Sequence, residues 1–349
     1  MNTLHKIINQ SSNNLNDLDD NSVHLVITSP PYPMIQMWDD QFGQMNKEIT
    51  VALENNDGNK AFELMHQELD YVWKSISRVL VDGGIACINI GDATRKIDDT
   101  FQLFNSYSRV VKKFIDLGFV NLPNIIWRKT TNSPTKFMGS GMYPPSAYIT
   151  LEHEHILVFR KGSNRKFSKD KTLIRRESAY FWEERNKWFS DCWMDIKGTR
   201  QTVKNEDIMR RSAAYDIELV HRLVNMYSIK YDTVLDPYLG TGTTTIGAIL
   251  NERNSVGYEI EKDFFKHTLD RIDQIPVNFY NNEIHHRIKE HLKFIDDRKK
   301  AGKEIKYENK NHKFEIVTGQ EKELKLNLIK SIKKQENQFI VEYEQDKNK

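Results

Sequence analysis

The residues near the start of the chain with the clearest chemical potential form the sequence T-S-P-P-Y at 28–32, directly after the apolar run V-H-L-V-I. Two adjacent prolines remove two backbone donors and fix two φ angles. Such a segment serves either as a rigid turn or as a means of holding bare carbonyl groups and a ring in place. Ser29 and Tyr32 flank the prolines, which favours the second alternative, because a simple turn requires neither a hydroxyl nor an aromatic ring.

A second candidate site is the glycine-containing sequence D-P-Y-L-G-T-G-T-T at 236–244, between a predicted strand and a predicted helix. Gly240 and Gly242 allow the backbone to pass close to a ligand, and the helix N-terminus presents free N–H groups. The sequence is neither a phosphate-binding P-loop, because no G-K-[ST] follows, nor a G-x-G-x-x-G dinucleotide motif. Glu259 ends the next predicted strand, where an acid can accept hydrogen bonds from both ribose hydroxyls of a nucleoside. The alternative is a tight turn with a surface glutamate.

The elements that must position these residues alternate along the chain. Strands are expected at 4–8, 23–28, 85–90, 119–128, 154–160, 233–238 and 255–259, and helices at 62–80, 101–115, 212–227 and 241–253. Alternating strands and helices favour a mostly parallel sheet with helices on both faces. In such a sheet the two motifs can meet at the carboxyl ends of adjacent strands, although about 200 residues separate them. The polar stretch at 34–60 is expected to be a mobile loop.

The two motifs together resemble those of the amino-methyltransferases of DNA. The S-P-P-Y form is most similar to the cytosine-N4 group, in which Ser stands where most adenine-N6 enzymes have Asp or Asn. The catalytic motif precedes the cofactor motif, which resembles the circularly permuted β class, whose members often belong to restriction-modification systems. Further similar segments are E-H-I-L-V-F-R-K-G at 154–162, R-R-S-A-A-Y-D-I-E-L at 210–219, with Asp216 where a proline is common, and V-G-Y-E-I-E-K-D-F at 256–264.

This resemblance covers roughly residues 1–275. It implies an α/β fold with a Rossmann-like, circularly permuted seven-stranded sheet, a small recognition insert and a C-terminal extension. It implies site-specific methylation of the N4 amine of a cytosine flipped out of duplex DNA, with S-adenosylmethionine as methyl donor and no metal. The cofactor-binding residues that it implies are Thr28, Asp236, Pro237, Tyr238, Gly240, Gly242, Thr243, Thr244 and Glu259.

The chemistry of an exocyclic amine explains the proline motif. The lone pair of this amine is delocalised into the base, so the amine must be held in line with the methyl group, with its lone pair turned toward it. Ser29 Oγ and the Pro30 carbonyl can accept hydrogen bonds from the two N–H groups of the amine. Pro30 and Pro31 keep that carbonyl in place. Tyr32 offers a flat face to a base that has left the duplex.

Charge is distributed unevenly along the chain, whose net charge is +2. Residues 160–211 contain 15 basic and 8 acidic residues together with seven aromatic ones, a combination that suits phosphates and bases. We therefore expect a DNA-recognition insert at 161–206. The candidate DNA-contacting residues are Arg175, Arg176, Trp182 and Trp188, although the two tryptophans are equally expected to pack beneath the insert.

Several weaker candidates lie near these motifs. Asp92 either serves the site or caps a helix, and Trp38 and Asp39 are candidates for the wall of a base pocket. His153 and His155 alternate on one strand like a metal pair, but a third ligand is missing from the pattern, so no metal site is predicted.

Other functions fit less well. A cytosine-C5 methyltransferase needs a cysteine nucleophile after a proline, whereas Cys87 follows Ala and Cys192 follows Asp. Adenine-N6 methylation on the same scaffold remains the main alternative, and a methyltransferase of RNA or protein is less favoured. A DNA-binding protein without activity would not need both motifs intact.

Bulk properties agree with a globular enzyme. The 349 residues are 38% hydrophobic and 29% charged, with two cysteines and no apolar run of membrane-spanning length. We expect a cytoplasmic protein that acts on double-stranded DNA without a membrane and, where it belongs to a restriction-modification system, has a cognate restriction endonuclease as partner. The expected regions are a catalytic half at 1–160, the insert at 161–206, a cofactor-binding half at 207–275 and an extension of unknown role at 276–349, with helices at 281–300 and 321–334.

Overall fold

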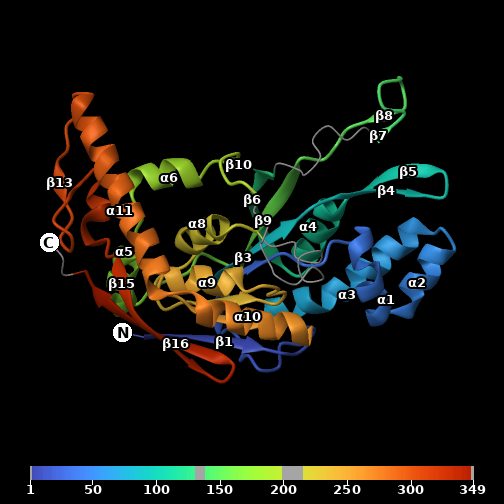
Figure 1. The fold of residues 1–349 in the computed structure, drawn as a ribbon, viewed down its shortest axis with the longest axis horizontal. Helices are drawn as coiled ribbons and strands as arrows, with labels where there is room; N and C mark the ends of the chain where they lie inside the picture. The colour runs from blue at the N-terminus through green and yellow to red at the C-terminus, as the bar shows by residue number, and fades with distance from the viewer. Residues whose placement is uncertain (1, 130–137, 199–214, 347–349) are drawn as a thin grey trace.

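A ten-stranded sheet runs through the centre of the protein, for which a computed structural model describes residues 2–129, 138–198 and 215–346 (Figure 1). In spatial order its strands are β10 (Cys192–Trp193), β6 (Phe119–Arg128), β9 (His153–Lys161), β3 (Leu80–Ile90), β2 (Val23–Thr28), β11 (Thr233–Asp236), β12 (Asn254–Tyr258), β1 (Asn2–Ile8), β16 (Gln338–Gln345) and β15 (Asn327–Gln335).

The seven strands from β6 to β1 are the seven that the sequence predicts, which confirms the expected seven-stranded core. Strands β3, β2, β11, β12 and β1 are parallel neighbours, whereas β9 runs antiparallel to both β3 and β6. The carboxyl ends of β2, β11 and β12 therefore meet at one edge of the sheet, which is where a wound sheet binds its ligand.

Helices cover both faces of this sheet because its central strands are apolar on both faces. In β2, Val26 packs into the cluster that includes Trp73 of α3 (Gly58–Val79), while Leu25 and Ile27 pack into the cluster that includes Leu219 of α8 (Ile217–Tyr227). The further helices are α4 (Ser106–Asp116), α9 (Thr243–Leu250) and α10 (Lys262–Gln274). No helix among the described residues combines the length and the apolar character needed to cross a membrane.

Three predictions about local structure are wrong, and the first concerns the stretch at 34–60. The expected mobile loop at 34–60 contains a 3-10 turn (Gln36–Trp38) and the helices α1 (Asp39–Met45) and α2 (Lys47–Glu54). Phe42 of α1 and Ile49 of α2 are fully buried, and this packing outweighs the polar composition.

The expected helix at 101–115 begins only at Ser106. The residues before it form a hairpin of β4 (Ala93–Ile97) and β5 (Thr100–Phe104), and the Asn105 side chain then caps α4 by accepting a hydrogen bond from the Ser108 amide. A second hairpin pairs β7 (Met138–Gly139) with β8 (Ala147–Tyr148).

The C-terminal extension is part of the same fold. It contains α11 (Val277–Lys300), the short pair β13 (Tyr307–Glu308) and β14 (Glu315–Ile316), and a 3-10 turn (Gly319–Glu323). A helix was expected at 321–334, but the chain forms the β15–β16 hairpin there, and β16 pairs antiparallel with β1. Phe339 and Val341 of β16 are fully buried, so the sequence boundary at 276 does not separate two hydrophobic cores.

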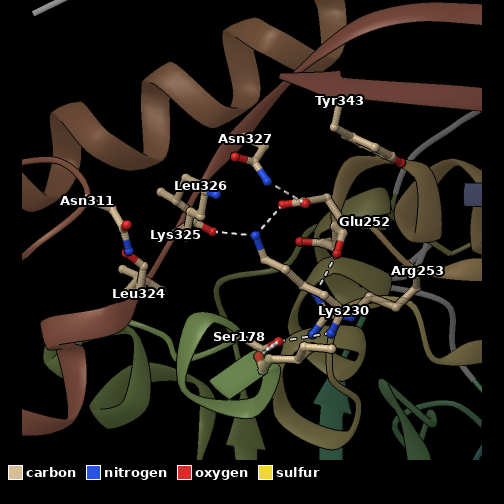
Figure 2. A network of polar contacts seen from close by, with 12 residues as sticks. Ser178, Lys230, Glu252, Arg253, Asn311, Leu324, Lys325, Leu326, Asn327 and Tyr343 are labelled. Atoms are coloured by element: carbon tan, nitrogen blue, oxygen red, sulfur yellow. Dashed lines mark hydrogen bonds and ion pairs between the residues drawn. The ribbon is translucent and has the colours of Figure 1, made fainter. Parts of the chain in front are cut away.

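A buried polar network joins the extension to the rest of the molecule (Figure 2). The ammonium group of Lys230 donates to Glu252 (2.5 Å) and to the carbonyl of Lys325 (2.6 Å), and Asn327 donates to the other oxygen of Glu252 (2.7 Å). The Lys230 amide donates to the hydroxyl of Ser178, which belongs to the expected insert. Because buried charges are costly without partners, this network fixes core, insert and extension together.

The described part of the expected insert contains α5 (Lys169–Glu177), α6 (Trp182–Trp188) and β10. Because β9 runs opposite to its neighbours, the insert starts at the amino-terminal edge of the parallel strands. Arg165 confirms this position with two hydrogen bonds to Asp232, which directly precedes β11. Residues 199–206 of the expected insert lie outside the described part of the chain.

Candidate functional site

The two sequence motifs line one pocket at the carboxyl ends of β2, β11 and β12. The proline motif contributes Ser29, Pro30, Pro31 and Tyr32, and the glycine loop contributes Pro237, Tyr238, Gly240 and Thr243. Glu259, which follows β12, lines the same pocket, together with Trp38, Gln41 and Gln44 from the segment of α1. The structure thus brings together two segments about 200 residues apart, as the sequence predicts.

The proline motif is held by a polar network that includes two residues from neighbouring strands. Ser29 Oγ donates to the Tyr32 hydroxyl (3.0 Å), which donates in turn to Glu154 of β9 (2.9 Å). Asn89 of β3 donates to both the Tyr32 hydroxyl (2.9 Å) and Glu154 (2.7 Å), and Lys129 donates to the other Glu154 oxygen (3.0 Å). These contacts fix the ring of Tyr32 and the hydroxyl of Ser29 at the pocket wall.

The environment keeps Tyr32 protonated. Burial and the adjacent Glu154 carboxylate raise the pKa of the Tyr32 hydroxyl well above its ordinary value. The ring lies close to the backbone of Gly91, where a Cβ atom would approach a ring carbon of Tyr32 to 2.9 Å. A glycine after β3 is therefore required for this ring position. Asn89, Gly91 and Glu154 are site residues that were not expected from the sequence.

Asp236 lies beneath the pocket and organises the glycine loop. Its carboxylate accepts hydrogen bonds from Thr28 (2.6 Å), Thr244 (2.6 Å), the Tyr215 hydroxyl (3.1 Å) and the Tyr238 amide (3.0 Å). Burial raises the pKa of Asp236, and these hydrogen bonds oppose that shift. Four donors occupy the acceptor capacity of a carboxylate. Asp236, Thr28 and Thr244, which the sequence suggested as cofactor ligands, are thus placed to shape the loop from below.

The two loop glycines have different roles in the structure. Both have positive φ angles, +53° at Gly240 and +85° at Gly242. A Cβ atom on Gly240 would meet no atom within 4 Å, whereas one on Gly242 would lie 2.6 Å from the Thr268 side chain. Gly242 precedes the first turn of α9. Gly240 therefore keeps space open at the pocket, and Gly242 permits close packing against α10.

Glu259 presents a carboxylate to the pocket. One of its oxygens accepts from the Gly240 amide (3.0 Å) and the other from the Glu261 amide (2.8 Å). Each oxygen retains a second lone pair. Burial raises the pKa of Glu259 to about 7, so its protonation state changes near neutral pH.

These features fit a nucleoside-containing cofactor. The carboxylate of Glu259 can accept hydrogen bonds from a ribose diol, and Gly240 leaves room for a ligand next to it. Tyr238, Tyr258 and Phe264 also line the pocket and offer aromatic surface to a purine. Asp216 is not a pocket residue: it caps α8, since its side chain accepts from the Glu218 amide (2.9 Å).

The structure places the expected DNA-contacting residues away from this pocket. Arg175 and Arg176 are exposed on α5, which lies beside α11 and β15 at the opposite end of the molecule from the β4–β5 and β7–β8 hairpins (Figure 1). Trp188 is 3% exposed and packs against His221 and Arg287. Trp182 stacks on Phe294 of α11. Both tryptophans therefore join the insert to the extension, which is the packing alternative for these two residues.

The weaker candidates are also placed by the structure. Asp92 accepts from the Tyr107 amide (2.9 Å) in the first turn of α4, which is the helix-capping alternative. Trp38 lines the pocket, whereas Asp39 is held by both terminal nitrogens of Arg95 (2.8 Å each). His153 and His155 lie side by side, and no cluster of three potential metal ligands occurs within the described ranges.

Comparisons with known proteins agree on one family. The family model described as DNA methylase matches residues 23–270. The Type II methyltransferase M.MthZI of Methanothermobacter thermautotrophicus is 47% identical over 348 residues, which cover 99% of this chain and 96% of that protein. The Type II methyltransferase M.MjaI of Methanocaldococcus jannaschii is 51% identical over 271 residues, 74% of this chain and 88% of that protein.

Solved structures show the same fold. A candidate DNA modification methylase from Thermus thermophilus, in complex with S-adenosyl-L-methionine, has a TM-score of 0.60 and 30% identity, with coverage of 76% of this chain and 92% of that chain. The cytosine-N4-specific PvuII DNA methyltransferase has a TM-score of 0.54 with coverage of 79% and 89%. At 17% identity this second similarity concerns the fold alone.

Proposed function

Because the chain belongs to the DNA methylase family, we propose that it transfers a methyl group to the exocyclic N4 amine of cytosine in duplex DNA. The methyl donor is S-adenosylmethionine, which supplies an electrophilic methyl group on a sulfonium centre. The observation that carries the proposal is that one pocket is lined by both the proline motif and the glycine loop, because methyl donor and acceptor must meet in one place.

The proposal assigns the acceptor side of the pocket to the proline motif. Ser29 Oγ and the Pro30 carbonyl each accept a hydrogen bond from one N–H group of the target amine. This arrangement turns the lone pair of the amine toward the methyl group. Tyr32 provides a face for the extruded base, and its hydroxyl is held by Asn89 and Glu154. With its pKa raised, Tyr32 stays neutral and adds no charge beside the reacting amine.

The proposal assigns the donor side to the glycine loop and the strand after it. Glu259 accepts hydrogen bonds from the ribose hydroxyls. The cofactor is surrounded by Pro237, Tyr238, Gly240 and Thr243. Asp236, Thr28, Thr244 and Gly242 act one layer deeper by fixing the loop.

The choice of cytosine rests on Ser29. The short serine side chain stands where the adenine-N6 group most often has Asp or Asn. In the family that the sequence resembles, the same scaffold methylates either cytosine N4 or adenine N6. The relatives named Type II methyltransferases support a role in a restriction-modification system, in which methylation protects host DNA from a partner endonuclease.

The test is to identify the methylated nucleoside. Plasmid DNA from cells expressing the protein is digested to nucleosides and analysed by mass spectrometry, with DNA from cells expressing Ser29→Ala as the control. N4-methyldeoxycytidine only with the active protein is the expected result. N6-methyldeoxyadenosine instead would contradict the cytosine assignment, and no methylated nucleoside would contradict the proposed function.

A further inference from the structure

Two hairpins project from the sheet beside the pocket. Both β4–β5 and β7–β8 extend well beyond the central strands, on the side opposite α5 and α11 (Figure 1). The rings of Phe101 in β5 and Tyr148 in β8 stack with a centroid separation of 4.5 Å and an interplanar angle of 10°. This stacking joins the two hairpins into one projecting unit, hereafter the paired hairpins.

The end of the β7–β8 hairpin exposes large apolar side chains. Met142 is 80% exposed and Tyr143 is 78% exposed, and Ile149, just after β8, is 85% exposed. Met142 and Tyr143 lie in the turn between β7 and β8 and form an apolar tip, whereas Ile149 lies at the other end of the hairpin. Exposed apolar side chains gathered on a protein surface indicate a binding site. The described residues of this hairpin from 138 to 149 carry no charged side chain.

The base of the paired hairpins is connected to the proposed catalytic motif. Lys129, directly after β6, donates to Glu154, and Glu154 accepts from the Tyr32 hydroxyl. On the other hairpin, Arg95 of β4 binds Asp39 at the start of α1, the helix whose Gln41 and Gln44 line the pocket. A partner held by the hairpins would therefore lie against the pocket that receives the target base.

The absence of acidic residues suits a nucleic acid as that partner. No acidic residue occurs in the sequence between Asp116 and Glu152, and the basic Arg128 and Lys129 are paired with Glu152 and Glu154 at its end. An acid-free segment tolerates close approach of phosphates. Exposed apolar and aromatic side chains next to it suit stacked bases, because proteins insert such side chains between base steps.

We propose that the paired hairpins bind the duplex beside the target base, and that Met142 and Tyr143 insert into the base stack to fill the space left by the extruded base. This inference rests on the proposed function, because it assumes a DNA target. Extruding a base costs the energy of its pairing and stacking. An apolar tip that occupies the vacated space offsets part of that cost.

The test compares the double variant Met142→Ala/Tyr143→Ala with a matched control, Tyr71→Ala, which removes a 57% exposed tyrosine on α3 outside the pocket lining. The substrate is a synthetic duplex with a site that the wild-type protein methylates in plasmid DNA. A second duplex has the same site with the target base opposite an abasic position, so that extrusion requires no unpairing. Methyl transfer, S-adenosylmethionine affinity and oligomeric state are measured for all three proteins.

The expected result is a decrease of about tenfold or more in methyl transfer to the paired duplex for the double variant, with recovery on the duplex that lacks the opposing base. Cofactor affinity and the Tyr71→Ala control should match the wild type. Equal methylation of both duplexes by the double variant and the wild type would overturn the inference, as would a change in oligomeric state, which would identify a subunit interface. Failure of the wild-type protein itself to methylate plasmid DNA would instead contradict the proposed function.

Discussion

At the scale of single residues, the site separates side chains that face the pocket from those that hold its walls. Glu259 and Gly240 line the pocket, whereas Asp236 is saturated by donors from three segments of the chain. This distinction was not available from the sequence, in which D-P-Y-L-G-T-G-T-T is one motif. Glu154 and Asn89 were missed because they come from different strands. Glu154 begins the similar segment at 154–162, but nothing in that segment marks it as a partner of Tyr32.

Substitution of the two loop glycines tests this distinction between residues that face the pocket and residues that hold its walls. Both Gly240→Ala and Gly242→Ala place an L-residue at positive φ, a strain of about 1–2 kcal/mol. Only Gly242→Ala also forces a contact with Thr268, so it should lower the free energy of unfolding further, while Gly240→Ala should chiefly weaken cofactor binding. Denaturant unfolding and calorimetric titration with S-adenosylmethionine measure the two effects. The reverse ranking in both measurements would be incompatible with this account of the loop.

The raised pKa of Glu259 predicts that cofactor affinity depends on pH. Burial raises its pKa to about 7, and only the ionised carboxylate accepts two hydroxyl hydrogen bonds. Cofactor binding favours the ionised form, so affinity should fall as the pH drops below about 7 and level off above it. Glu259→Gln should bind more weakly, by about 1.5–3 kcal/mol, and should lose this component of the pH dependence. An unchanged pH profile in Glu259→Gln would show that another group is responsible.

At the scale of elements, the extension completes the sheet. β16 pairs with β1 and contributes Phe339 and Val341 to a core cluster shared with α9, α10 and α11. The sequence did not predict the β15–β16 hairpin because β15 contains K-S-I-K-K, whose lysines resemble a solvated helix surface. Lysines on an edge strand discourage pairing with other chains, and β15 is that edge.

Truncation of Phe339 tests the structural role of the extension. Phe339 is fully buried, so Phe339→Ala should lower the free energy of unfolding by about 3–5 kcal/mol. Lys333→Ala on the exposed side of the same hairpin should change it by less than about 0.5 kcal/mol. Urea denaturation of both variants provides the comparison. If Phe339→Ala were as mild as Lys333→Ala, the extension would not share the core.

At the scale of the whole molecule, the sequence predicted the seven central strands and the meeting of the two motifs. These predictions succeeded because apolar runs such as V-H-L-V-I mark buried parallel strands, and the carboxyl ends of such strands share an edge. The expected position of DNA recognition at 161–206 stays a prediction, because composition does not give the direction in which a segment leaves the sheet. The reversed strand β9 places the start of the basic, aromatic-rich segment at the opposite edge, where Arg165 binds Asp232. Later in the same segment, β10 pairs with the carboxyl-terminal part of β6.

The measurement that tests the central claim most directly is made on Ser29→Ala. If Ser29 binds the target amine and not the cofactor, its loss should lower methyl transfer to plasmid DNA by about 100-fold or more. Calorimetric affinity for S-adenosylmethionine should stay within about twofold of the wild type, a difference of roughly 0.4 kcal/mol. Unchanged methyl transfer, or a loss of cofactor affinity as large as the loss of transfer, would contradict the assignment of one pocket with separate donor and acceptor sides.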